Sequence, residues 1–211
     1  MNEPKITGYH WQDKELTGAH DYLLPSVLSE MAGMNVEDSK KKVFELGCGN
    51  GSIAHQFSLH GWSVTGVDPS IEGIVQANSS YPHLNLNQGS AYDDLVSKYG
   101  TFPLVTSLEV VEHVYFPRLY AATLFSLVEP GGAAIISTPY HGYWKNLALA
   151  ITGKLDSHFT VLWDHGHIKF WSIKTLSVLL KEVGFIDIQF LLVGRIPLLA
   201  KSMIVIAKKP N

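Results

Sequence analysis

Cysteine, charge and long hydrophobic runs are all scarce in this sequence. Its 211 residues contain one cysteine, Cys48, which excludes an internal disulfide and a cysteine cluster for zinc. The N-terminus is polar and lacks the apolar core of a signal peptide, and no run approaches the roughly 20 apolar residues that span a bilayer. These absences predict a cytoplasmic protein without a transmembrane segment, and they leave peripheral contact with a membrane open.

The low and slightly negative charge of the chain argues against one class of partner, duplex nucleic acid. Charged residues make up only 17% of the chain, and the formal net charge is −3. A protein that binds duplex nucleic acid needs a broad basic surface, so we expect no such partner, although a local basic groove stays open. Hydrophobic residues make up 46%, which is typical of a globular chain, and the length predicts one domain over residues 1–211.

Strand and helix patterns alternate regularly from residue 42 onward. Extended apolar patterns predict strands over 42–46, 63–68, 84–90, 103–110, 133–139, 185–193 and 201–209. Helical patterns cover 19–34, 53–61, 70–80, 92–100, 118–128 and 172–184, whereas 140–171 is less regular. Ser70 and Ser172 are predicted N-caps, and Gly61 and Gly184 are predicted stops. The alternation predicts an α/β sandwich with a mostly parallel sheet, whose ligands bind at the carboxyl ends of the strands.

A glycine-rich turn follows the first predicted strand, in "FELGCGNGS". Its glycines allow the backbone to turn sharply and to approach a ligand closely. Asp68 ends the next strand, 21 residues after Gly47, where a carboxylate can accept hydrogen bonds from both ribose hydroxyls. The turn reads G-x-G-x-G rather than the dinucleotide pattern G-x-G-x-x-G, and Glu45 stands just before it. An acid there disfavours a pyrophosphate and suits a cationic cofactor such as S-adenosylmethionine; a nicotinamide oxidoreductase is the rival.

Five stretches together resemble the class I S-adenosylmethionine-dependent methyltransferases: "VFELGCGNGSIA", "VTGVDPS", "NQGSAYDDL", "LEVVEHV" and "LVEPGGAAIISTP". The resemblance implies a Rossmann-like three-layer sandwich with a seven-stranded sheet, order 3-2-1-4-5-7-6, whose last strand is antiparallel. The ubiquinone-biosynthesis O-methyltransferases are the most similar subgroup. By resemblance, the cofactor would contact Glu45, Gly47, Cys48, Gly49, Asn50, Gly51, Asp68, Pro69, Ser90, Ala91, Leu108 and Glu109.

Charged residues end the fourth predicted strand, in "LEVVEH". Ubiquinone-biosynthesis and small-RNA 2′-O-methyltransferases carry the same E-x-x-E-H pattern, and in the small-RNA family acids and histidines bind a divalent metal. By this resemblance, Glu109, Glu112, His113 and the downstream His167, with His165 as second choice, would hold Mn²⁺, Fe²⁺, Zn²⁺ or, less suitably, Mg²⁺. Alternatively, His113 acts alone as a general base beside Glu109, or these residues only cap and solvate a turn.

The acceptor region follows no motif with a chemical interpretation. Residues 140–171 are predicted to lie over the acceptor pocket, with an aromatic lid or a small satellite core formed by Tyr140, Tyr143, Trp144, Phe159 and Trp163. His141 and His158 are further candidates, and Tyr9 and Trp11 of an N-terminal cap (1–34) are predicted to fold over the cofactor or to pack in the core.

The preferred function is methyl transfer to an oxygen of a small, partly apolar acceptor that resembles a phenol or quinol, by a monomer or homodimer. The alternatives are methylation of RNA ends or of a sugar intermediate, and binding of S-adenosylmethionine without catalysis.

Overall fold

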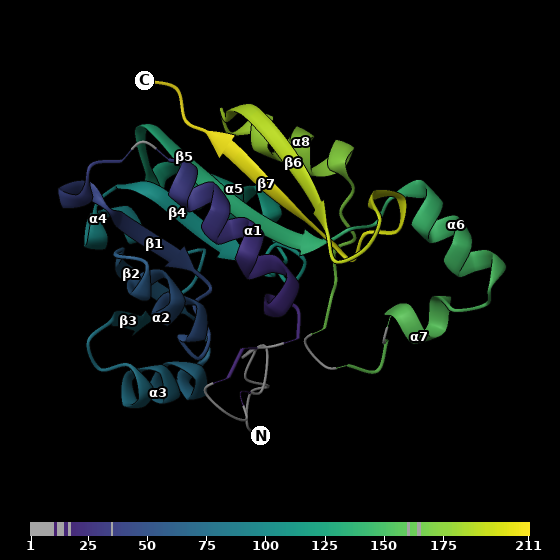
Figure 1. Cartoon of the computed structure of the whole chain (residues 1–211), viewed down its shortest axis with the longest axis horizontal. Helices are drawn as coiled ribbons and strands as arrows, with labels where there is room; N and C mark the ends of the chain where they lie inside the picture. Colours follow the sequence, from purple (N-terminus) through teal and green to yellow (C-terminus); the bar gives the residue numbers. More distant parts are fainter. Residues whose placement is uncertain (1–10, 12–14, 17, 35, 160, 164–165) are drawn as a thin grey trace.

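Seven strands form one sheet in the order β3-β2-β1-β4-β5-β7-β6 in a computed structural model of the chain (Figure 1). The structure describes residues 11, 15–16, 18–34, 36–159, 161–163 and 166–211. Strands β1 to β5 run parallel, and β7 pairs antiparallel with both β5 and β6. The strand order, the mostly parallel sheet and the antiparallel last strand that the sequence predicts are therefore confirmed.

The strands are β1 (Lys42–Leu46), β2 (Ser63–Asp68), β3 (Asn85–Gln88), β4 (Phe102–Leu108), β5 (Val128–Pro139), β6 (Ile186–Val193) and β7 (Ser202–Lys208). The α-helices are α1 (His20–Gly33), α2 (Ser52–Leu59), α3 (Ile71–Ser80), α4 (Leu95–Tyr99), α5 (Pro117–Leu127), α6 (Tyr143–Ile151), α7 (Leu155–Phe159) and α8 (Ile173–Glu182). Short 3₁₀ turns cover η1 (Asp38–Lys40) and η2 (Pro197–Leu199). Among the described residues, none of the helices is long and apolar enough to cross a bilayer.

Helices cover both faces of the sheet (Figure 1). Apolar residues of α1, α2 and α3 pack on one face, in a core that includes Leu23, Phe57 and Ile74. Residues of α4, α5 and α8 form the core of the other face, which includes Leu95, Leu124 and Leu180. The central strands are apolar on both sides because they are buried between these two layers.

The predicted helix ends are confirmed where a cap defines them. The Ser70 hydroxyl accepts a hydrogen bond from the Gly73 amide at 3.1 Å, and Ser172 forms a capping box with Thr175. Gly61 and Gly184 follow the C-caps of α2 and α8 with φ values of 84° and 109°, a conformation that favours glycine. Such caps satisfy polar groups at the helix ends and stabilise a helix by about 1 kcal/mol each.

The prediction of irregular structure over 140–171 is wrong for its first half. Helices α6 and α7 occupy Tyr143–Ile151 and Leu155–Phe159, and both extend away from the sheet in Figure 1. None of the residues of α6 is buried, so this helix does not pack on either core of the sheet, although its sequence has an apolar face at helical spacing. Strand β5 also begins earlier than predicted, at Val128, before the "EPGG" segment.

Candidate functional site

The glycine turn after β1 brings the backbone close to neighbouring side chains. Gly47 has φ 94°, and a Cβ at this position would collide with Val110. Gly49 has φ 49°, and its Cβ would collide with the ring of Trp11. The turn is tied to the next strand because the amides of Gly47 and Cys48 both donate to the Val67 carbonyl, at 2.8 and 3.0 Å.

Asp68 holds this turn at the carboxyl end of β2. One carboxylate oxygen accepts a hydrogen bond from the Gly49 amide at 2.9 Å, and the other accepts one from the Ser70 amide at 2.8 Å. Burial raises the pKa of Asp68, and these two amide bonds lower it in part. Each oxygen retains a second lone pair, so the carboxylate can still accept bonds from a ligand.

Glu45 is buried at the end of β1, with only 2% of its surface exposed. Its Oε2 atom has no hydrogen-bond partner among the described residues. Burial raises its pKa to about 8, and the negative charge of Asp68 adds to the rise. A buried carboxylate without a partner is costly, so this position favours a cationic ligand.

Two adjoining cavities open at the carboxyl ends of the strands, with volumes of about 700 and 620 Å³. The larger one is lined by eight of the predicted cofactor residues: Glu45, Gly47, Cys48, Asn50, Asp68, Pro69, Leu108 and Glu109. The smaller one is lined by Gly47, Pro69, Ser90 and Ala91. Gly49 and Gly51 line neither cavity, because Trp11 covers Gly49 and Gly51 packs against Leu86 and Ala77.

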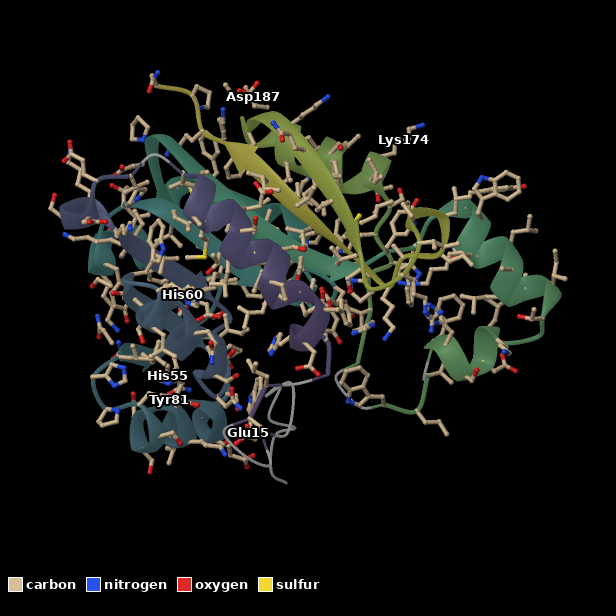
Figure 2. All side chains as sticks on the ribbon, viewed as in Figure 1. Glu15, His55, His60, Tyr81, Lys174 and Asp187 are labelled. Carbon is tan, nitrogen blue, oxygen red and sulfur yellow. The ribbon has the colours of Figure 1, made fainter. Side chains whose placement is uncertain are left out.

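Trp11 therefore lies where the N-terminal segment was predicted to close the site. Its ring packs on Gly49 and Gly73 and lines the larger cavity. Tyr9, the other candidate, lies outside the described residues. The rings of His55 on α2 and Tyr81 at the end of α3, both labelled in Figure 2, stack with their centroids 4.5 Å apart.

Glu109 adopts a left-handed backbone conformation directly after β4, with φ 55°. Its amide and its side chain both contact Ser137 of β5: the amide donates to the hydroxyl at 3.0 Å, and the hydroxyl donates to Oε1 at 2.9 Å. The chain forms a turn after Glu109 and does not become helical until Pro117. Glu109, Glu112 and His113 therefore do not share one face of a helix.

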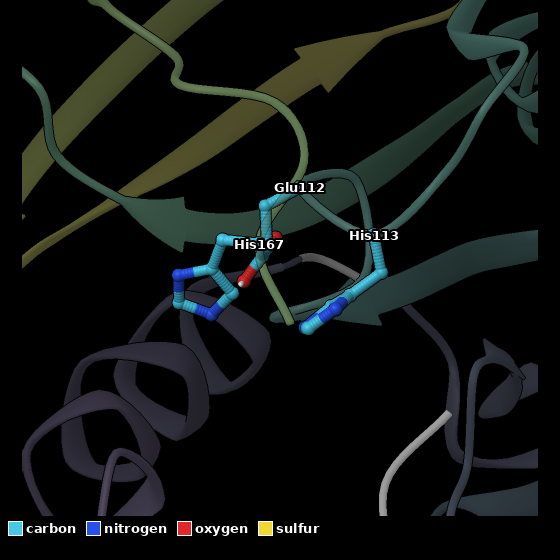
Figure 3. Close-up of side chains that lie close together, drawn as sticks. All are labelled: Glu112, His113 and His167. Atoms are coloured by element: carbon cyan, nitrogen blue, oxygen red, sulfur yellow. Dashed lines mark ion pairs between the residues drawn. The ribbon is translucent and has the colours of Figure 1, made fainter. Parts of the chain in front are cut away.

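Glu112, His113 and His167 lie together (Figure 3), and their nearest potential ligand atoms are all within 4.8 Å of one another. His167 Nε2 lies 3.9 Å from Glu112 Oε1. His167 is brought close because the amides of Ile168 and Lys169 both donate to the Glu112 carbonyl, at 2.9 and 3.0 Å. The structure does not bring Glu109 into this group, and His165 lies outside the described residues.

The two histidines of the cluster suit base catalysis or metal ligation when their rings are neutral. His113 Nδ1 lies 3.2 Å from the Gly166 carbonyl, so Nδ1 donates, and in the neutral ring the lone pair is on Nε2. Burial lowers the pKa of His167 to about 4, helped by the neighbouring His113 and His158. Burial raises the pKa of Glu112 well above its ordinary value, and the charge of Glu109 adds to this rise.

The surroundings of the buried Glu112 carboxylate indicate whether this cluster can bind a metal ion. Both of its oxygens are buried without a hydrogen-bond partner among the described residues. A divalent cation would satisfy these oxygens, and two imidazoles with one carboxylate are a donor set that suits Mn²⁺, Fe²⁺ or Zn²⁺. The residues therefore fit a metal ion.

The segment 140–171 contributes to both cavities. His141, His158, Trp163 and His167 line the larger one, and Phe159 and Trp163 line the smaller one. Tyr143 and Trp144 of α6 are instead exposed, at 72% and 58%, and with Tyr140 they line neither cavity. For these three aromatic residues the structure does not support a place in the lid.

Several polar residues of the larger cavity carry no motif and were missed by the sequence analysis, among them Tyr22, Lys145, Arg195, Lys201 and Ser202. Tyr22 lies on α1 and hydrogen-bonds to Ser202 at 3.0 Å, although 180 residues separate them in sequence. A long-range contact of this kind leaves no local pattern, and only the fold brings these side chains to the pocket.

The sequence of this chain is similar to those of known methyltransferases. A family model described as "Methyltransferase domain" matches residues 16–189. A curated ubiquinone biosynthesis O-methyltransferase of Psychrobacter arcticus is 29% identical over 154 residues, which cover 69% of this chain and 59% of that protein. One from a Bradyrhizobium species is 31% identical over 114 residues, covering 53% and 45%. The chain spans about half the length of these curated relatives.

Solved structures share the fold. The methyltransferase domain of bacterial CtHen1-C superposes with a TM-score of 0.66 at 20% identity, covering 90% of this chain and 97% of that one. A SAM-dependent methyltransferase of Archaeoglobus fulgidus superposes with a TM-score of 0.64 at 16% identity, covering 89% and 93%.

Proposed function

This chain belongs to the class I S-adenosylmethionine-dependent methyltransferase family, and on that premise we propose that it transfers the methyl group of S-adenosylmethionine to an oxygen of a small, partly apolar acceptor that resembles a phenol or quinol. One observation carries the proposal. The residues that suit the cofactor and the His113–His167 pair line the same 700 Å³ cavity. A methyl donor and an acceptor hydroxyl can therefore meet beside groups that remove a proton.

The cofactor would occupy both cavities. Glu45 and the turn around Gly47 would hold the methionine part, because the cofactor's ammonium group would pair with the buried carboxylate of Glu45. Asp68 would accept hydrogen bonds from the ribose, and the adenine would lie in the smaller cavity beside Ser90 and Ala91.

The reaction would be a direct in-line displacement at the methyl group. An acceptor hydroxyl is a poor nucleophile until it loses its proton, and Nε2 of His113 is suited to accept it. Glu109 lies beside the same cavity, and its bonds with Ser137 fix its orientation. His141, His158 and Trp163, which line the larger cavity, would cover the acceptor and keep water out.

A divalent metal is the alternative means of activation. Glu112, His113 and His167 would hold it. A bound metal supplies a Lewis acid that orients the acceptor oxygen and lowers its pKa.

The proposed function is tested by incubating the protein with methyl-labelled S-adenosylmethionine and a panel of hydroxylated acceptors. We expect label on an oxygen of a phenol- or catechol-type acceptor, and calorimetric binding of S-adenosylmethionine. Binding of the cofactor with no transfer to any acceptor would favour the non-catalytic alternative. Binding of NAD in place of S-adenosylmethionine would contradict the proposal.

The metal has a separate test. We expect exhaustive dialysis against a chelator to lower the methyl-transfer rate at least tenfold, and His167→Ala to lower the metal content measured by mass spectrometry. His83→Ala is the matched control, because His83 lies outside both cavities. Full activity in chelator with no metal bound would leave His113 as a base alone.

Trp11 is expected to close the cofactor site. Trp11→Ala would uncover Gly49 and remove an apolar wall of the cavity, so the Kd for S-adenosylmethionine should rise about tenfold by calorimetry. Trp144→Ala is the control, since the exposed Trp144 lines neither cavity. Equal affinities of both variants would show that Trp11 only packs against the turn.

A second candidate is methylation of a hydroxyl at an RNA end. It is favoured by the Glu112, His113 and His167 cluster, because small-RNA 2′-O-methyltransferases carry the same E-x-x-E-H pattern. Short single-stranded RNA therefore belongs in the same acceptor panel.

A further inference from the structure

Three cationic side chains line the larger cavity and lack an acidic partner. Lys145 comes from α6, and Arg195 and Lys201 come from the loop that joins β6 to β7. Within the described part of the chain, none of the three lies within ion-pair distance of a carboxylate. Like charges that share a cavity repel one another, so this arrangement favours an anion among them.

Lys145 is fixed rather than loosely solvated. Its Nζ donates to the Tyr140 carbonyl at 2.8 Å and to the Lys201 carbonyl at 3.2 Å. An ammonium group has three N–H donors, so one remains for a ligand. The head group is partly buried, and burial together with the charge of Arg195 lowers the pKa of Lys145 to about 8, although the charge of Glu109 raises it in part. A bound anion would offset both of these effects.

The opposite charge is found elsewhere in the same cavity. Glu45, Asp68 and Glu109 contribute carboxylates on the side of the glycine turn and β4. Charges of opposite sign therefore line different parts of the cavity: the acids lie at the strand ends, and the cations lie on α6 and the β6–β7 loop. Such a charge distribution favours a ligand that carries a negative group at the end nearest the three cations.

Apolar side chains line the cavity near the cations, beside the polar His141 and His158. Ala148, Leu149, Leu199 and Phe170 line the cavity together with Lys145. Apolar walls exclude water and strengthen a charge-assisted hydrogen bond, and they suit a ligand with a hydrophobic body.

We propose that the acceptor carries an anionic group, a carboxylate or a phosphate, that binds Lys145, Arg195 and Lys201 while its hydroxyl points toward His113. The class of acceptor is thus a hydroxylated, partly apolar acid. The inference deepens the proposed function and rests on it for the role of the hydroxyl, whereas the anion site itself can be measured without methyl transfer.

The binding test uses the protein saturated with S-adenosylhomocysteine. Calorimetry compares benzoate with benzamide, and phenyl phosphate with phenol, so that each pair differs mainly in charge. We expect at least one anion to bind tenfold or more tightly than its neutral partner, because a hydrogen bond to a charged group has that effect or a larger one. Which of the two anions binds distinguishes a carboxylate from a phosphate.

Variants locate the site. Lys145→Gln and Arg195→Gln should each reduce anion affinity about tenfold, and Lys154→Gln, an exposed lysine on the same segment outside the cavity, should not. Arg195 is exposed and has no structural bond of its own in the described chain, so its variant should fold even if Lys145→Gln does not. The inference would be overturned if charged and neutral probes bind equally, or if no anion binds. It would also be overturned if a variant that combines Lys145→Gln and Arg195→Gln still prefers the charged probe.

An activity test separates this inference from the proposed function. Methyl transfer to 3,4-dihydroxycinnamate should exceed transfer to its methyl ester at least tenfold in kcat/KM. Equal rates with both acceptors would uphold methyl transfer and refute the anion site. Anion binding that depends on Lys145 without transfer to any acceptor would refute the proposed function and uphold the anion site.

Discussion

His113→Ala is expected to lower kcat for methyl transfer by a factor of about 10²–10⁴, which is the usual contribution of a positioned general base. His113 lines the cavity, and the Gly166 carbonyl orients its ring so that Nε2 can accept a proton. The Kd for S-adenosylmethionine should change less than about threefold, because removal of a base affects the transition state more than the bound cofactor. Single-turnover kinetics with labelled cofactor and calorimetry measure the two quantities.

His60→Ala is the matched control for this loss. His60 is exposed at the end of α2 (Figure 2), and we expect no change in kcat. His113→Gln should not restore activity, because an amide can donate hydrogen bonds but cannot accept the proton. A variant that retains more than a third of the wild-type kcat would mean that another group removes the proton.

Glu45→Gln is expected to weaken the binding of S-adenosylmethionine about 100-fold. The change removes the negative charge that would pair with the cofactor's ammonium in a buried site, where loss of one partner costs about 2–5 kcal/mol. Calorimetry at pH 8.5 measures the Kd, and Glu37→Gln on the exposed surface is the control. An unchanged Kd would place the ammonium group elsewhere.

The same substitution is expected to stabilise the cofactor-free protein. The folded-state pKa of Glu45 is about 8, above its ordinary value of 4.5, so the folded state binds the proton more tightly than the unfolded state. The stabilisation from protonated Glu45 is complete below pH 4.5 and is lost as the pH rises through 8. Glu45→Gln should abolish this loss, so that its melting temperature exceeds that of the wild type by several degrees at pH 8.5 but not at pH 4.5.

Cofactor binding should release a proton for the same reason. A cation favours ionised Glu45, so the affinity should rise with pH up to about 8 and level off above it. Calorimetry in two buffers with different ionisation enthalpies reports the proton, and Glu45→Gln should remove most of it. Absence of proton release at pH 7 would contradict the raised pKa.

The sheet and the cofactor end of the site could be predicted from the sequence because their signals are local. The glycine turn, the acid at the end of β2 and the caps at Ser70 and Ser172 each depend on neighbouring residues. The contact of His167 with Glu112 was predicted only through a family pattern, since 55 residues separate the two positions.

The remaining parts depend on backbone geometry and on long-range packing. The left-handed conformation of Glu109, which directs its side chain to Ser137, has no signature in a non-glycine residue. Lys145 and Arg195 meet only because α6 and the β6–β7 loop lie at the same cavity. The two short helices of the 140–171 segment bury none of their residues in the core, but α6 has an apolar face at helical spacing, a local signal that the sequence analysis missed.

The antiparallel strand β7 has a consequence for the order of assembly. It lies between β5 and β6, and in the described part of the chain β6 pairs with no other strand, so β6 lacks this partner until β7 is synthesised and inserted. Ser202, the first residue of β7, also bonds to Tyr22 and lines the cavity. Contacts between segments so distant in sequence form slowly. A chain emerging from the ribosome would therefore contain the glycine turn early, and the side of the cavity lined by Lys201 and Ser202 only after β7 has been added.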